Sequence, residues 1–219
     1  MDRQPVVAGQ FYHHDPAILA KQLKTFLSAA GDKDSAPSIM AMAPHAGYVY
    51  SGGVAGDVLG QANLHKTIIL LGPNHTGKGP KLSVWNKGSW VIPGGSLAIE
   101  EDLAAKLLEN DSRLQADFEA HEREHSLEVI IPFLHATNPD ITIVPICVAE
   151  PSMYELFSVA EKMAKVIMNW GEPISLVISS DMSHYIPESH AKKLDDLALD
   201  RITALDAAGL YETVRGNDI

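Results

Sequence analysis

Three apolar segments of the chain each lead to a histidine. SIMAMAPH reaches His45, TIILLGPNH reaches His75, and ISLVISSDMSH reaches His184, with Asp181 three residues before it. Short apolar runs followed by small or turn-forming residues are typical of buried strands in a parallel sheet. Side chains just past the carboxyl ends of such strands converge on one crevice. The pattern therefore predicts an α/β fold in which three imidazoles and one carboxylate share a site.

Helical patterns alternate with these strands. We expect helices at residues 16–30 (capped by Asp15), 51–60, 100–110, 126–135, 153–167 and 189–210. The expected strands are 39–43, 67–71, 141–148 and 174–179, and residues 82–92 resemble a hairpin turning at 86–88. Such alternation predicts a three-layer αβα sandwich around a mostly parallel or mixed central sheet. We expect one domain over residues 1–219.

Composition excludes several classes of function. The chain has 219 residues and a formal net charge of −11, which leaves no basic surface for nucleic acid. The apolar stretches are far shorter than the roughly 18 residues that a membrane-spanning helix needs, so we expect a cytoplasmic protein without a membrane partner. The single cysteine, Cys147, cannot form an internal disulfide, and its place in ITIVPICV indicates a small buried hydrophobe.

The loops after the strands carry the candidate chemistry. APHAGYVYSGG presents His45 among glycines that let the backbone turn tightly, and GPNHTGKG repeats the design around His75. In SSDMSHY, Asp181 could orient the imidazole of His184 or join it on a metal; the alternative is a purely structural cap. We expect four further residues to line the pocket: Tyr48, Asn74, His125 and Tyr185.

HEREH at residues 121–125 satisfies both H-E-x-x-H and its inverted form, which bind zinc in metalloproteases. Its surroundings lack a long apolar helical stripe before His121, and Ser126 resembles the cap of a helix that starts after the motif. We therefore favour a charged surface turn with one inward histidine, His125. A zinc hydrolase remains a distant alternative.

APHAGYVYSGGVAG, LGPNHTG, EHSLEVIIPFL, VPICV and ISSDMSHY follow one another in this order. In this respect the chain resembles the MEMO family, whose prokaryotic members are called AmmeMemoRadiSam system protein B. The resemblance implies a fold like that of class III extradiol dioxygenases, with a non-haem iron pocket. It implies that His45 and His75 bind metal, that His184 is an acid/base residue, and that Asp181 lies beside it.

The likeness ends at the C-terminus. Family members continue past a segment like RGNDI into a Cys-Gly whose cysteine completes the metal set, whereas this sequence stops at Ile219. We therefore expect a domain without the C-terminal cysteine-containing segment of the family. A site with two histidine ligands should hold metal weakly. Cys147 lies in a different motif and is no substitute.

Two functions of different classes follow. The first is a mononuclear iron or copper oxidoreductase in which His45 and His75 bind metal and His184, oriented by Asp181, moves a proton. The second is a non-catalytic module that receives an anionic peptide or small acid in the same pocket. The strand-end loops contain no arginine, which weakens the second interpretation. The sequence leaves the metal, the substrate and the oligomeric state open.

Overall fold

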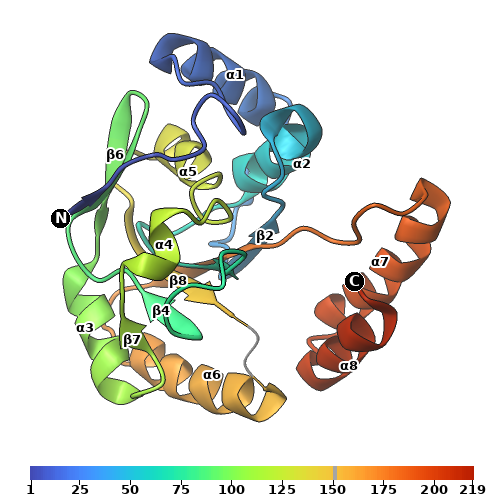
Figure 1. The fold of residues 1–219 in the computed structure, drawn as a ribbon. Coiled ribbons are helices and arrows are strands. Elements are labelled where there is room, and N and C mark those ends of the chain that lie inside the picture. The colour runs from blue at the N-terminus through green and yellow to red at the C-terminus, as the bar shows by residue number, and fades with distance from the viewer. Residues whose placement is uncertain (150–151) are drawn as a thin grey trace.

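The structure is a computed structural model that describes residues 1–149 and 152–219. A twisted central sheet runs through the molecule, with helices on both faces (Figure 1). The main path of the sheet has the strand order β1-β5-β6-β8-β3-β9-β2, and β4 and β7 extend it beside β8. The strands are β1 Asp2–Arg3, β2 Met40–Ala43, β3 Thr67–Pro73, β4 Leu82–Val84, β5 Ser89–Ile92, β6 Gly95–Ile99, β7 Gln115–Ala116, β8 Thr142–Val148 and β9 Ile174–Ser179.

The centre of the sheet is parallel. β3 pairs in parallel with β8 on one side and with β9 on the other, and β9 pairs in parallel with the edge strand β2. Successive side chains of a strand point to opposite faces, and in β3 Ile68 and Leu70 enter one core while Ile69 enters the other. Both faces are therefore buried, which explains the continuous apolar run of this strand.

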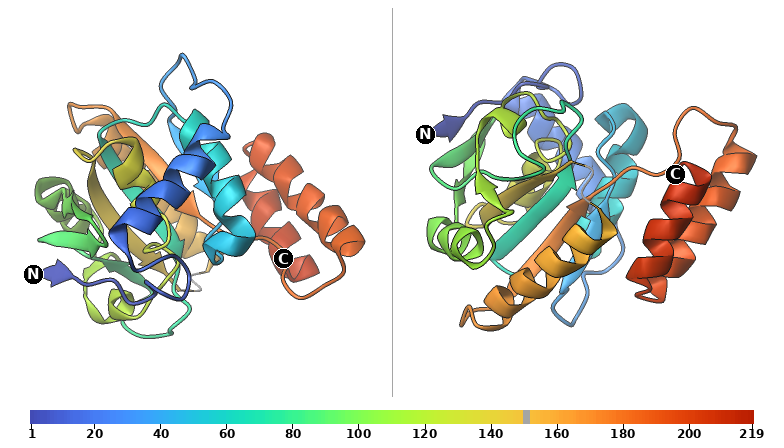
Figure 2. Two further views of the ribbon diagram at one scale, coloured as in Figure 1. Left: turned by 90° about the horizontal axis from the view of Figure 1, so that it is seen from above. Right: turned by 60° about the horizontal axis from the view of Figure 1, so that its bottom comes forward.

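Helices cover each face. The core on one side includes buried residues of α1 (Pro16–Ser28), α2 (Tyr48–Gln61) and α5 (Ile131–Thr137). The core on the other side includes α3 (Glu101–Asn110) and α6 (Met153–Met168). Figures 1 and 2 show the sheet between these two layers. The three-layer αβα prediction is confirmed.

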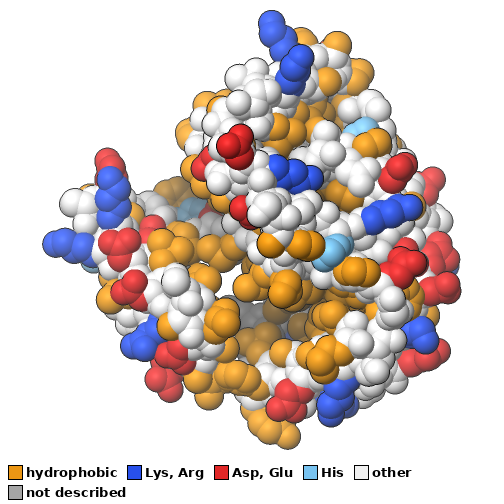
Figure 3. Space-filling model, turned by 180° about the vertical axis from the view of Figure 1, so that it is seen from behind, with side chains coloured by type: hydrophobic (Ala, Val, Ile, Leu, Met, Phe, Trp, Pro, Cys, Tyr) orange, Lys and Arg blue, Asp and Glu red, His pale blue; other side chains and the backbone are white. Residues whose placement is uncertain are grey.

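The prediction of one continuous helix over residues 189–210 is wrong. The chain forms α7 (Glu188–Thr203) and α8 (Ala207–Asn217), which pack against each other beside the edge strand β2. The break occurs because Leu205 adopts a positive φ of 55° and the Asp206 side chain accepts the Gly209 N–H, which starts a new helix. From behind, apolar side chains surround a hollow beside these helices (Figure 3). A hollow of about 250 Å³ is lined by Met40, Met42, Ile178, Ile202, Leu205 and Leu210, among others.

The expected hairpin at 82–92 is also wrong. β4 pairs antiparallel with β8, whereas β5 pairs antiparallel with β6, so the hairpin turn lies at residues 93–94. Gly94 has a φ of 92°, which suits such a turn. Gly88 serves another purpose, because a Cβ there would lie 1.9 Å from the carbonyl oxygen of Met1. Its missing side chain makes room for the N-terminal strand, which pairs with β5.

α4 (Glu119–Glu122) is a single short turn of helix, and turns connect it to α5. The expected helix at 126–135 therefore starts later, at Ile131, with Pro132 in its first turn. Among the residues that the structure describes, no helix has both the length and the apolar character needed to cross a membrane.

The crossing of α1 and α2 depends on glycine. A Cβ at Gly56 would lie 2.5 Å from Cβ of Phe26, whereas a Cβ at Gly53 would meet no atom within 4 Å. We predict that Gly56→Ala lowers the free energy of unfolding by about 1–3 kcal/mol, because the helices must move apart. Gly53→Ala, the matched control, should raise it by about 0.5–1 kcal/mol through helix propensity. Urea denaturation measures both; equal effects would contradict the close crossing.

Candidate metal centre

Three imidazoles meet at the carboxyl-end edge of the sheet. His45 follows β2, His75 follows β3, and His125 lies in the turns between α4 and α5. Each ring offers one nitrogen, and the three nitrogens all lie within 4.8 Å of one another. The ring centroids of His75 and His125 are 4.5 Å apart in a stacked arrangement, and His45 meets both rings edge-on at 5.3 and 5.6 Å. The third imidazole of the cluster is thus His125 rather than His184.

A hydrogen bond to Ser179 orients the ring of His45. The hydroxyl of Ser179, the last residue of β9, donates its proton to the Ser126 carbonyl oxygen at 2.6 Å. Its oxygen also lies 2.8 Å from Nδ1 of His45, and since its proton is used, this nitrogen must be the donor. The arrangement leaves the Nε2 lone pair of His45 free. Burial lowers the pKa of His45 to about 4, so the ring is neutral at pH 7.

Glu124 orients the other two histidines. Its carboxylate is 0 % exposed and accepts Nδ1–H of His75 at 2.8 Å. It also accepts the backbone N–H groups of His75, His125 and Ser126. An ionised carboxylate can only accept, so Nδ1 of His75 carries the proton and Nε2 is free. One buried side chain thereby joins the loop after β3 to the segment that carries His125.

The ionisation of these groups follows from the same contacts. Burial alone would raise the pKa of Glu124, but the hydrogen bonds from His75 and from backbone N–H groups lower it to about 2. The hydrogen bond to Glu124 raises the pKa of His75. Burial lowers the pKa of His125. A charged carboxylate thus stabilises the imidazole proton on the side of His75 that faces away from the cluster.

Asp181 links the cluster to His184. Its Oδ1 accepts the backbone N–H of His45 at 2.6 Å. Its Oδ2 lies 3.9 Å from Nε2 of His45 and 3.7 Å from Nε2 of His184. The His184 side chain is 57 % exposed, so it lies at the surface beyond Asp181. Residues 180–184 are not helical, and the pair meets through an extended loop.

The other expected pocket residues have different environments. Tyr48 is buried, and its hydroxyl donates to the Val129 carbonyl oxygen at 2.9 Å. The Asn74 side chain shapes its own loop, since its oxygen accepts N–H groups of Thr76 and Gly77. Tyr185 is fully exposed with a φ of 58°, so the prediction that it lines the pocket is not met. The loop turns its ring outward, beside His184.

The surface-turn interpretation of HEREH is wrong for His121 and Glu124, although Glu122 and Arg123 are exposed and His125 points inward. His121 and Glu124 are fully buried, and so is Cys147, whose Sγ lies 3.3 Å from Nδ1 of His121. Nε2 of His121 lies 3.1 Å from the Ser83 carbonyl oxygen, so this ring makes structural contacts on both sides. Burial raises the pKa of the Cys147 thiol, as expected of a small buried hydrophobe. Only His125 of the motif joins the cluster.

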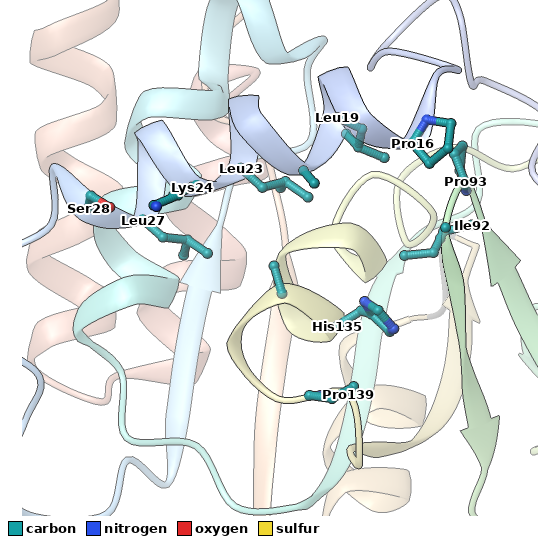
Figure 4. Close-up of a pocket in the computed structure, with 13 residues that line it drawn as sticks. Pro16, Leu19, Leu23, Lys24, Leu27, Ser28, Ile92, Pro93, His135 and Pro139 are labelled. Atoms are coloured by element: carbon teal, nitrogen blue, oxygen red, sulfur yellow. The ribbon is translucent and has the colours of Figure 1, made fainter.

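The structure has one hollow beside this cluster and a second one away from it. One of about 490 Å³ is bounded by Asp181, His184 and apolar side chains that include Met42, Val54 and Met182. A larger one, of about 550 Å³, lies between α1, α5 and the β5–β6 turn. Figure 4 shows that leucines of α1 line this second hollow, together with Lys24 and His135. None of the three clustered imidazoles lines either hollow, but the smaller one adjoins the cluster through Asp181, which accepts the backbone N–H of His45.

Sequence reasoning missed two residues that hold the imidazoles. The sequence pattern indicates no contact between Ser179 and an imidazole, and it places Glu124 in a charged surface turn. A signal for Glu124 exists in hindsight, because it directly precedes His125 and is followed by the apolar run LEVIIPFL. Such a position, next to a segment that must be buried, favours an inward carboxylate.

The fold and the cluster define an αβα protein with three imidazoles gathered at the carboxyl ends of parallel strands. The model of the Memo-like protein family matches residues 3–219, and the chain belongs to this family. It is 37% identical over 235 residues to a MEMO1 family protein of Sulfolobus acidocaldarius, covering 100% of this chain and 82% of that protein. A MEMO1 family protein of Desulfurococcus amylolyticus is 36% identical over 230 residues, covering 99% and 81% of the two chains. The resemblance seen in the sequence is confirmed.

The carboxylate of Glu124 provides a test of this geometry. In metal-free Glu124→Gln we predict a lower pKa of His75, because the charge that stabilises its imidazolium form is lost. The free energy of unfolding should fall by about 1–3 kcal/mol, since buried N–H groups lose their acceptor. NMR titration of the histidine rings and urea denaturation measure the two effects. Glu122→Gln, an exposed change in the same segment, should leave both nearly unchanged; an unaltered His75 pKa in Glu124→Gln would contradict the assigned contact.

Proposed function

We propose that this chain is a metal-dependent redox protein in which His45, His75 and His125 bind one iron or copper ion. The observation that carries the proposal is the convergence of three ring nitrogens within 4.8 Å of one another. The resemblance to the class III extradiol dioxygenases supports a mononuclear, non-haem site. His125 offers a third imidazole beside His45 and His75.

The donor set fits such an ion. Imidazole suits iron, copper and zinc, and binding needs the neutral ring, which the low pKa of His45 ensures at pH 7. Nδ1 of His45 and of His75 contacts Ser179 and Glu124 respectively, so both rings can present Nε2 to the ion. Metal-binding histidines commonly use their second nitrogen in this way. A bound iron or copper ion would supply single-electron exchange with oxygen or an organic substrate.

Asp181 and His184 form the acid–base part of the proposal. The Asp181 carboxylate lies between the His45 and His184 rings, and His184 contacts solvent. His184 can therefore take a proton from solvent and deliver it to a group held in the adjoining hollow, while Asp181 orients its ring. The apolar walls of that hollow favour a small organic substrate with few charges.

The non-catalytic alternative has less support. An anionic peptide or acid bound at the imidazoles would meet the carboxylates of Asp181 and Glu124 nearby. The loops that follow β2, β3 and β9 contain no arginine to offset that repulsion. A cation is electrostatically favoured at this place.

Metal analysis tests the proposal directly. In protein purified without chelators, we expect iron or copper in the wild type and its loss in His45→Ala, His75→Ala and His125→Ala. Removal of one of three ligands should weaken binding by at least about 100-fold, more than a change in a supporting residue. His190→Ala, an exposed histidine on α7, is the control and should retain the metal. Full occupancy in His45→Ala or His75→Ala would rule out those ligands.

The role of His184 needs a kinetic test. We predict that His184→Gln retains the metal but consumes oxygen about 10²–10⁴-fold more slowly, because glutamine cannot move a proton. An oxygen electrode measures this rate on iron-loaded protein with ascorbate as electron donor. Tyr185→Phe, a change at the adjacent exposed ring, should keep the wild-type rate. An unchanged rate in His184→Gln would remove the assigned role.

A further inference from the structure

Arg3 lies in the N-terminal strand β1, far in sequence from any candidate ligand, yet its side chain is only 2 % exposed. Its guanidinium donates through Nε to the His121 carbonyl oxygen at 2.8 Å and through Nη2 to the Glu124 carbonyl oxygen at 2.6 Å. Nη1 donates to the Glu128 carboxylate at 2.7 Å. All three acceptors belong to residues 121–128, the segment that also carries His125.

This segment has little regular structure of its own. Apart from the short helix α4, residues 121–130 form turns and irregular backbone, with local hydrogen bonds such as that from the Val129 N–H to the His125 carbonyl oxygen. Most of this stretch is buried although Glu122 and Arg123 are exposed, so its buried polar groups need partners from elsewhere in the chain. Arg3 satisfies two of its carbonyl oxygens, one at the residue directly before His125.

Glu128 extends the same connection. Its buried carboxylate accepts the backbone N–H groups of Val6 and Val7 and the hydroxyl of Tyr12, in addition to Arg3. The adjacent Phe11 ring lies 4.7 Å from the His125 ring, between centroids. The N-terminal residues therefore contact both the backbone and the side chains of the segment that carries His125.

From these contacts we infer that Arg3 is a positioning residue for the imidazole cluster. It holds the backbone on either side of residues 122–123 so that His125 and the Glu124 carboxylate face His75. The inference rests on the proposed metal site for its function, but the geometry that Arg3 maintains exists in the metal-free protein. Arg3 does not touch the metal or the substrate.

Arginine is suited to this task because its planar fork can satisfy three acceptors at once. A lysine ammonium is a single point of charge and cannot reach the same three acceptors in one geometry. The guanidinium also lies over the Trp90 ring, with Cζ 4.3 Å from the ring centroid. That stacking fixes the plane of the fork between the sheet and the segment.

The test compares Arg3→Gln with the wild type in zinc affinity, measured against a competing chelator, and in the Cu²⁺ electron paramagnetic resonance spectrum. We expect zinc to bind about 10–100-fold more weakly, as is typical when a supporting residue of a metal site is changed. The nitrogen hyperfine pattern in the Cu²⁺ spectrum of Arg3→Gln should indicate fewer coordinated imidazoles than that of the wild type. The zinc affinity of Arg3→Lys should lie between those of the wild type and Arg3→Gln. A purely structural loss of stability would not change the number of coordinated imidazoles.

Arg113→Gln is the matched control, because Arg113 also forms a fork on a buried carboxylate, that of Asp111, with no contact to the cluster. It should bind zinc within about twofold of the wild type. Wild-type zinc affinity and an unchanged Cu²⁺ spectrum in Arg3→Gln would overturn the inference. If Arg3→Gln does not fold, the same measurements on Arg3→Lys decide.

A metal-free measurement separates this inference from the proposed function. The backbone N–H groups of His125 and Ser126 both donate to Glu124 at 2.9 Å. Their hydrogen exchange should be faster in Arg3→Gln than in Arg113→Gln at equal global stability. If the wild type binds no metal, the proposed function fails, while faster exchange still supports the positioning role. Unchanged exchange at both amides overturns that role whether or not metal binds.

Discussion

The parallel pairing of β9 with β2 and β3 is the constraint on which the site depends. The register aligns Ala43 with Ser179 and Leu71 with Ile178, so the three strands end at neighbouring points. Ser179 then reaches His45 with its hydroxyl, and the loop after β3 brings His75 to the same edge. A shift of β9 by one residue would turn the Ser179 side chain to the opposite face of the sheet. The orientation of an imidazole thus depends on the backbone pairing of the sheet.

The remaining imidazole depends on buried charge instead of strand pairing. Glu124 and Glu128 are both buried, and burying an unpaired carboxylate costs several kcal/mol, so each needs a full set of donors. Those donors come from three parts of the chain: the loop after β3, the N-terminal segment and the segment itself. Because the acceptors lie only four residues apart, satisfying them brings these three parts together. The position of His125 follows from this requirement.

The difference between local strand patterns and long-range contacts to buried carboxylates explains which features the sequence could predict. The helix cap at Asp15, the strand before His75 and the layered fold follow from local patterns, and the structure contains all three. The separation of β4 from β5 belongs to a second group of features, because it depends on the pairing of β4 with the distant strand β8, which no short pattern encodes. The burial of Glu124 belongs to the same group, and so does the place of His125 as the third clustered imidazole, since the sequence predicted His125 only as an inward, pocket-lining residue. The charged neighbours of Glu124 favour a surface turn, whereas long-range partners such as Arg3 make its burial possible.

The charges around the imidazoles favour one kind of ligand. At neutral pH the ring of His45 is neutral, while the carboxylates of Glu124 and Asp181 lie on two sides of the cluster. In a partly buried place, the field of such carboxylates is screened less than at the surface, so it attracts a cation and repels an anion. A divalent ion would both receive three lone pairs and offset the nearby negative charge. The same field would repel an anionic substrate unless the ion were already bound. We therefore expect the metal to bind before any acidic substrate.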